Sequence, residues 1–138
     1  MWTRNVESDV LPVARALGAG LVAWGPLGTG FLAGVRELEQ GDFRHNAPRY
    51  RPDKLSLDID RFAPLDRLAE ELGVTPAQLA LAWLFHQGAD IAPIPGTRST
   101  EHLDSNVEAT GIRLSPEVLA RIHELAPPHL AAGEALLA

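Results

Sequence analysis

The chain has 138 residues, enough for one domain with a buried core, and it has no cysteine, which excludes disulfides, iron–sulfur clusters and thiolate zinc sites. Twelve basic residues against eighteen acidic ones give a net charge of −6, which argues against a nucleic-acid partner. No stretch approaches the ~20 apolar residues of a membrane-spanning helix, so we expect a soluble, cytoplasmic protein with no membrane partner.

A helix and a buried strand are predicted at the start of the chain. Ser8 or Asp9 can cap a helix that ends near residue 17. Residues 21–24 (LVAW) form a short, wholly apolar run between two glycines, which is typical of a parallel strand covered on both faces. Residues 25–34 are rich in glycine and are expected to form a turn.

A long loop and two helices are predicted next. Residues 35–58 have no periodicity and gather charge, which indicates a mobile loop. Helical spacing returns over residues 60–72. A capping box with Thr75 and Gln78 then opens a helix to about residue 87, and this helix is apolar nearly all round, so we expect it to be buried.

A second strand and two further helices complete the pattern. Residues 91–94 form another short apolar strand. Ser99 or Thr100 begins a helix to about residue 109, and Ser115 begins a last one to about residue 125. This order predicts an α/β fold with parallel strands joined by right-handed crossovers. Because parallel sheets bury both faces under helices, two strands do not make a stable sheet, and the chain is expected to be incomplete.

Residues 95–100 (PGTRST) leave the second strand and run into a helix. Free amides at a helix start carry partial positive charge, hydroxyls can donate, and Arg98 can grip phosphate oxygens in a bidentate fork. In (β/α) barrels such sites are often built from the loops after the last two strands. The segment therefore predicts a phosphate site, with ordinary helix capping beside a solvated arginine as the alternative.

Gly28, Gly30 and Gly34 follow the first strand. A dinucleotide fingerprint would lead directly into a long helix, whereas these glycines lead into a charged segment. We therefore expect a turn at which a ligand approaches the backbone rather than a Rossmann site. Trp24, beside this turn, is suited either to stack on a planar ring or to pack in the core.

Other patterns point to chemistry less strongly. Tyr50 and Lys54, the only tyrosine and lysine, have the spacing used by short-chain dehydrogenases, but Pro52 breaks the helix that this pairing needs. The five histidines lack metal-binding spacing, so no metal site is predicted. Three charged residues could form a substrate cluster, although a solvated loop is the favoured interpretation: Asp42, Arg44 and Arg49.

Four runs in this order resemble the C-terminal portion of an aldo-keto reductase: LVAWGPLGTGFLAG, GDFRHNAPRY, GVTPAQLALAWLFHQGADIAPIPGTRSTEHLDSN and LSPEVLARIHELAP. The opening WTRNVE also resembles the stretch after strand six of the bacterial members. The resemblance covers nearly the whole chain to about Pro128. It implies an incomplete (β/α)8 TIM barrel over residues 1–138, in which this chain supplies strands seven and eight with their helices and binds NADPH in extended form.

The resemblance implies ten cofactor-binding residues from two loops: Trp24, Gly25, Pro26, Leu27 and Gly28, and Gly96, Thr97, Arg98, His102 and Asn106. In the family an aromatic ring stacks on the nicotinamide, the second loop faces the 2′-phosphate, and an asparagine contacts the adenine. Some positions depart from the pattern. Gly25 stands where serine is usual, Thr29 and His102 replace frequent arginines, and Ser105 stands where glutamate is common.

No catalytic residue is predicted in this chain. The family's tyrosine, lysine, aspartate and histidine belong to its N-terminal half, and the single tyrosine and lysine here both fall in the predicted loop. The leading interpretation is the cofactor-binding part of an NADPH-dependent carbonyl reductase, inactive alone, left by truncation, a split gene or a mis-called start. The alternative is a non-catalytic half-barrel that associates with another chain or with itself through open strand edges.

Overall fold

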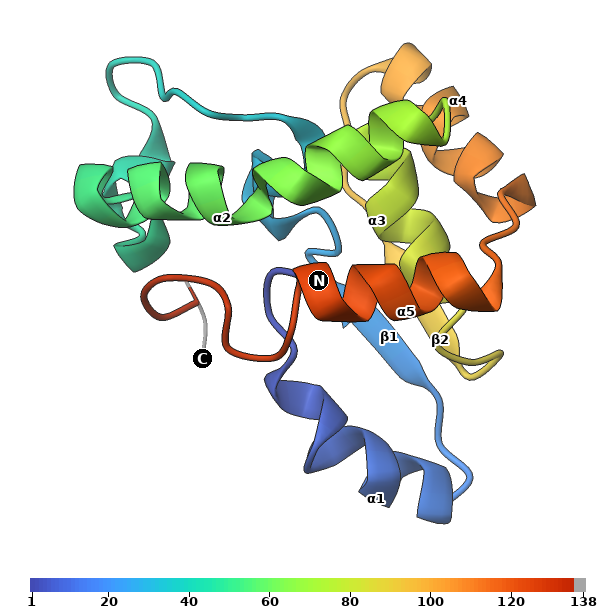
Figure 1. The fold of residues 1–138 in the computed structure, drawn as a ribbon. Helices are drawn as coiled ribbons and strands as arrows, with labels where there is room; N and C mark the ends of the chain where they lie inside the picture. Colours follow the sequence, from blue (N-terminus) through green and yellow to red (C-terminus); the bar gives the residue numbers. More distant parts are fainter. Residues whose placement is uncertain (136–138) are drawn as a thin grey trace.

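The computed structural model describes residues 1–135 and has an α/β fold, as predicted (Figure 1). The predicted strands and helices are present, most within three residues of the expected bounds: α1 (Val10–Ala16), β1 (Leu21–Trp24), α2 (Pro52–Glu71), α3 (Pro76–Phe85), β2 (Ile91–Ile94), α4 (Thr100–Glu108) and α5 (Pro116–Leu125). Helix α1 lies apart from the other helices in Figure 1. None of the helices in residues 1–135 combines the length and the apolar character needed to cross a membrane.

The two strands are parallel neighbours, with Leu21 paired with Ile91 and Trp24 paired with Ile94. Burial alternates along both strands, so one face of the sheet is covered and the other is open. On the open face Val22 and Trp24 are each 62% exposed and Ile94 is 50% exposed. The prediction that the first strand is covered on both faces is therefore wrong for residues 1–135. An apolar run suits a doubly covered strand, but the coverage itself depends on elements outside the run.

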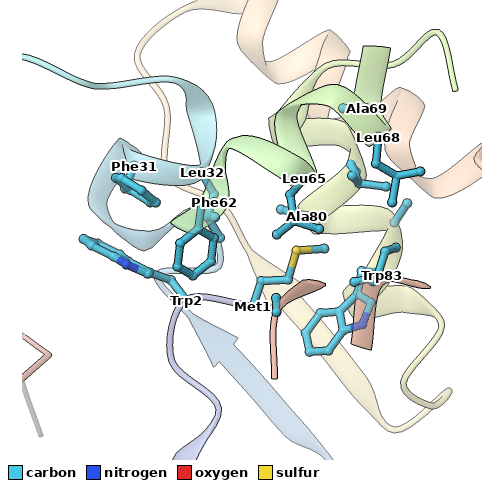
Figure 2. Packing of buried hydrophobic residues seen from close by; sticks show 14 of the residues in the cluster. Met1, Trp2, Phe31, Leu32, Phe62, Leu65, Leu68, Ala69, Ala80 and Trp83 are labelled. Carbon is cyan, nitrogen blue, oxygen red and sulfur yellow. The ribbon is translucent and has the colours of Figure 1, made fainter. Parts of the chain in front are cut away.

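The core lies where α2 and α3 meet the N-terminal segment and the glycine-rich turn (Figure 2). Trp2 stacks on Phe31 with ring centroids 4.5 Å apart, and Phe31 meets Phe62 edge to face at 5.4 Å. Helix α3 is buried over residues 79–83, as its all-round apolar character predicts. Its capping box is also confirmed, because the Thr75 hydroxyl accepts from the Gln78 amide and the Gln78 side chain accepts from Thr75.

The predicted loop over residues 35–58 is wrong at its C-terminal end. Helix α2 begins at Pro52, and two 3-10 helices precede it, at Phe43–Asn46 and Pro48–Tyr50. The first turns of α2 lack an apolar pattern because one of their buried positions is Asp58, whose carboxylate is satisfied by hydrogen bonds from distant residues. A buried carboxylate hides the helical period from any analysis based on hydrophobic spacing. The mobility of the segment stays a prediction.

Candidate functional site

The parallel pairing brings together the two predicted cofactor loops. Trp24 and Ile94 are register partners at the carboxyl ends of β1 and β2. The turn that begins at Gly25 and the turn that begins at Pro95 therefore leave the sheet from the same edge. Ligands of parallel α/β folds bind at this edge, because the loops that follow the strands converge there.

The first turn depends on glycine at two positions. Gly25 and Gly28 both have φ of +58°, a left-handed conformation that glycine adopts without strain. The Gly28 amide closes the turn by donating to the Gly25 carbonyl at 2.9 Å. A Cβ at Gly28 would lie 2.5 Å from Cε3 of Trp2, whereas a Cβ at Gly25 would meet no atom within 4 Å. Space beside Gly25 is thus open to a ligand, and Gly28 is packed.

A cavity of about 560 Å³ lies beside this turn. Its walls include four of the five residues predicted from the first loop, namely Trp24, Gly25, Pro26 and Gly28. Leu27 instead packs against the core. The volume falls within the range of ~300–1,000 Å³ that is usual for small-molecule sites. The five predicted residues of the second loop do not line this cavity, so the two halves of the predicted site are adjacent but distinct.

The second turn is exposed at Gly96, Thr97 and Arg98. The Thr97 hydroxyl accepts from the Ser99 amide at 3.1 Å, and the Ser99 hydroxyl accepts from the His102 amide at 3.2 Å. The Ser99 hydroxyl therefore caps α4, as in the alternative interpretation of this motif, and the Thr97 hydroxyl stabilises the turn before the helix. The Arg98 guanidinium is exposed, and within residues 1–135 no hydrogen bond or ion pair occupies it. Anion binding here would depend on that guanidinium and on the remaining amides of the first helical turn.

His102 and Asn106 continue the site along α4. They are four residues apart, so they lie on the same side of the helix. The His102 side chain is exposed, whereas Asn106 is only 9% exposed. Arg98 and His102 are thus exposed to solvent, whereas Asn106 is the one buried residue of α4.

Tyr50 and Lys54 do not form a pair. The Tyr50 hydroxyl is directed at the glycine-rich turn, where it lies 3.1 Å from the Thr29 carbonyl and 3.3 Å from the Gly28 carbonyl. Lys54 Nζ instead lies 3.6 Å from an Asp53 carboxylate oxygen. Helix α2 begins between the two residues, at Pro52, in agreement with the expected effect of that proline.

The solvated-loop interpretation of Asp42, Arg44 and Arg49 is wrong. Arg49 is 8% exposed, and its guanidinium donates to the Trp2 carbonyl at 3.1 Å and to the Thr3 hydroxyl at 2.7 Å. Burial lowers the pKa of Arg49. The Arg44 guanidinium hydrogen-bonds to Asp42 and, with the Arg44 amide, lowers the pKa of Asp42 to about 2. The Arg49 and Arg44 guanidinium groups therefore bind other segments of the chain, which replace water around them.

Sequence reasoning assigned no role to Trp2 and noted Thr29 only as a departure from the family pattern. Trp2 packs beneath Gly28, and Thr29 has a left-handed backbone that carries no sequence signal, since threonine rarely adopts it. Among residues 1–135 no three potential metal-ligating side chains gather.

Comparison with known proteins identifies the family of this chain. The model of the Aldo/keto reductase family matches residues 1–127. An aldo/keto reductase from Klebsiella pneumoniae, solved with NADP and acetate, is 31% identical with a TM-score of 0.64, over 92% of this chain and 37% of that one. The glycerol dehydrogenase from Gluconobacter oxydans is 26% identical with a TM-score of 0.71, over 88% and 38%. The present chain thus spans under two-fifths of the length of these structures, and it belongs to the aldo/keto reductase family.

Proposed function

We propose that this chain is the NADPH-binding C-terminal part of an aldo/keto reductase barrel, where it supplies strands seven and eight with their helices. The complete protein would reduce aldehydes or ketones to alcohols. Membership of the family supports this proposal, and so do the Klebsiella structures, which were solved with NADP and with NADPH. The observation that carries it is the pairing of Trp24 with Ile94, because it aligns the starts of both predicted cofactor loops.

The residues of the two loops fit the two ends of an extended dinucleotide. The exposed indole of Trp24 offers a face for a planar nicotinamide, and the open space at Gly25 lets a ligand approach the backbone. The exposed Arg98 guanidinium, which no hydrogen bond or ion pair engages within residues 1–135, lies beside the start of α4 and suits a 2′-phosphate. NADPH supplies the hydride when it is bound, and the residues of this chain bind and orient it.

The proposal assigns no catalytic residue to this chain. A general acid must reach the carbonyl oxygen of the substrate, and the hydroxyl of the single tyrosine is instead buried against the glycine-rich turn. The proton donor would therefore come from outside these 138 residues, and the chain alone would not turn over. The substrate pocket would also need residues from elsewhere.

The open face of the sheet favours a second candidate function. Val22, Trp24 and Ile94 are exposed apolar side chains on neighbouring strands, which suits a non-catalytic half-barrel that associates with another chain or with itself. This candidate predicts self-association in size-exclusion chromatography without NADPH binding. The reductase proposal predicts NADPH binding.

The test is a calorimetric titration of NADPH and of NADH into the wild-type chain and the Arg98→Ala variant. Removing a hydrogen bond to a charged group costs ~1.5–3 kcal/mol, so the variant should bind NADPH about 10- to 150-fold more weakly and NADH almost as before. Arg113→Ala is the matched control, because Arg113 is also exposed and, in the part of the chain that the structure describes, donates only to the Thr110 carbonyl.

Two results would count against the proposal. Equal losses for NADPH and NADH in Arg98→Ala would show that this guanidinium does not recognise the 2′-phosphate. Absence of NADPH binding by the wild-type chain, together with self-association, would favour the interaction module.

A further inference from the structure

The residue that follows the first cofactor loop has a strained backbone. Thr29 has φ of 52° and ψ of 27°, within the left-handed region. This conformation crowds the Cβ of any residue except glycine, and it is uncommon for β-branched side chains. Thr29 also lines the cavity beside Trp24 and Gly28. A strained residue in a turn that lines a cavity persists only where its surroundings hold it in place.

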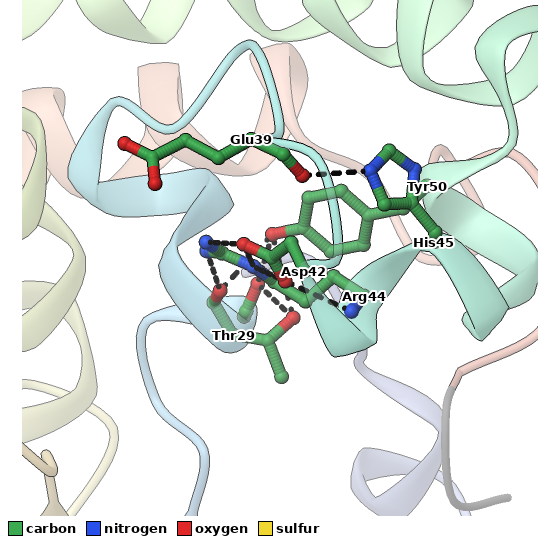
Figure 3. Close-up of polar contacts among 7 residues, drawn as sticks. Thr29, Glu39, Asp42, Arg44, His45 and Tyr50 are labelled. Atoms are coloured by element: carbon green, nitrogen blue, oxygen red, sulfur yellow. Dashed lines mark hydrogen bonds and ion pairs between the residues drawn. The ribbon is translucent and has the colours of Figure 1, made fainter.

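Two donors from the segment before α2 hold this turn (Figure 3). The Thr29 carbonyl accepts from Nη1 of Arg44 at 2.9 Å and lies 3.1 Å from the Tyr50 hydroxyl. The same hydroxyl lies 3.3 Å from the Gly28 carbonyl, which also accepts from the Thr29 hydroxyl at 2.8 Å. The carbonyls of Gly28 and Thr29 are therefore both hydrogen-bonded by side chains that lie 15 to 22 positions further along the chain.

Arg44 is itself fixed in position. Its Nε lies 3.0 Å and 3.1 Å from the two carboxylate oxygens of Asp42, and Nη2 also bonds to that carboxylate. The guanidinium lies over the Tyr50 ring, 5.7 Å from its centroid. The side chains of Arg44 and Asp42 are only 20% and 14% exposed, so water screens this ion pair less than an ordinary surface pair. Gly30 leaves the room that Arg44 needs, since a Cβ there would lie 2.9 Å from Nη1.

We propose that Asp42, Arg44 and Tyr50 form a clamp that holds Thr29 in its left-handed conformation and thereby sets the turn for cofactor binding. This inference rests on the function proposed above. Because the peptide unit is planar, fixing the Gly28 carbonyl also fixes the direction of the Thr29 N–H. Arg44 is a positioning residue: it acts on the backbone of the turn rather than on the 2′-phosphate.

The decisive comparison is between Arg44→Met, Thr29→Gly and the double variant. Arg44→Met keeps the length of the side chain but removes its donors, and the loss of a hydrogen bond from a charged group predicts about tenfold weaker binding of NADPH. The affinity for NADH should fall by the same factor, because the turn contacts a part that both cofactors share. Thr29→Gly alone removes the strain together with the Thr29 hydroxyl, so its affinity is the reference with which the double variant is compared. In the double variant it should restore most of the lost affinity, since glycine adopts the left-handed conformation without a clamp.

Arg36→Met is the matched control. Arg36 also donates to a carbonyl of the glycine-rich segment, that of Phe31, and also pairs with a carboxylate, that of Asp66 at 2.8 Å. The Arg36→Met variant should be less stable than the wild-type chain but should bind both cofactors with unchanged affinity. Asp42→Asn provides a milder perturbation that keeps the arginine, and it should weaken binding less than Arg44→Met.

The outcomes separate this inference from the function on which it rests. Unchanged cofactor binding in Arg44→Met, with the Arg98→Ala effect intact, overturns the clamp alone. The clamp is also overturned if Arg44→Met weakens NADPH binding and adding Thr29→Gly in the double variant does not restore the affinity. Arg44 would then support the fold without setting the conformation of the turn. A wild-type chain that binds no NADPH overturns the proposed function, and the positioning role with it.

Discussion

Replacing Asp58 tests how strongly the buried polar contacts stabilise this fold. The Asp58 carboxylate is fully buried, and one of its oxygens accepts from Nε1 of Trp2 at 2.6 Å while the other accepts from the Ala132 amide at 2.7 Å. Asp58→Ala would leave both donors buried without an acceptor. It would also remove a negative charge that favours the charged form of Arg49.

The magnitude follows from these two bonds. A hydrogen bond to a charged group contributes ~1.5–3 kcal/mol, so the loss of two predicts ~3–6 kcal/mol. The free energy of unfolding of a single domain is ~5–15 kcal/mol, and Asp58→Ala would therefore remove a large share of it. Asp58→Asn keeps one acceptor oxygen but turns an amide group toward the second donor, so about half of that loss is expected.

Urea unfolding followed by tryptophan fluorescence measures the effect directly. With a slope of ~1–3 kcal/mol per molar urea, the midpoint of Asp58→Ala should fall by at least ~1 M. Asp60→Ala is the control, because Asp60 is exposed on the same helix and should change the midpoint little. If the urea midpoint of Asp58→Ala is close to that of Asp60→Ala, the two hydrogen bonds of Asp58 do not stabilise the fold as we expect. Equal losses for the alanine and asparagine variants would show that hydrogen bonding is not the cause.

Two further predictions concern the first loop and its clamp. Gly28→Ala should lower the melting temperature more than Gly25→Ala, because both residues have φ of +58° but only Gly28 faces the Trp2 ring; equal losses would mean that backbone strain alone matters. The pKa of Asp42 is lowered from 3.8 to about 2, so its carboxylate stabilises the fold above pH 3.8 and this contribution is lost as the pH falls toward 2. The stability difference between wild type and Asp42→Asn should therefore shrink over that range in acid titrations, and a constant difference would contradict this reasoning.

The elements that sequence alone predicted are those specified by neighbouring residues. The capping box of α3, the Ser99 and Ser115 caps, and the glycine-bounded strands each depend on a few adjacent positions. Local chemistry of this kind can be recognised without a structure. The positions of the two loops predicted to bind the cofactor could be recognised for the same reason, since each follows a predicted strand.

The start of α2 and the roles of the charged residues were not predicted. Asp58 is buried because its partners lie 56 and 74 positions away, and Arg49 is buried because it reaches Trp2 across 47 positions. Until those partners are known, a charged residue in an aperiodic segment indicates a solvated loop. The left-handed conformation of Thr29 likewise depends on donors from Arg44 and Tyr50.

The sequence by itself determined where the two strands and most of the helices lie, which loops are predicted to bind the cofactor, and the family resemblance, because these depend on residues close together in the chain. Only the tertiary structure decided that the two loops leave the sheet side by side, since that follows from the pairing of Trp24 with Ile94. It also decided which charges are buried and that one face of the sheet is open. Those properties arise from contacts between distant segments, and no local pattern specifies them.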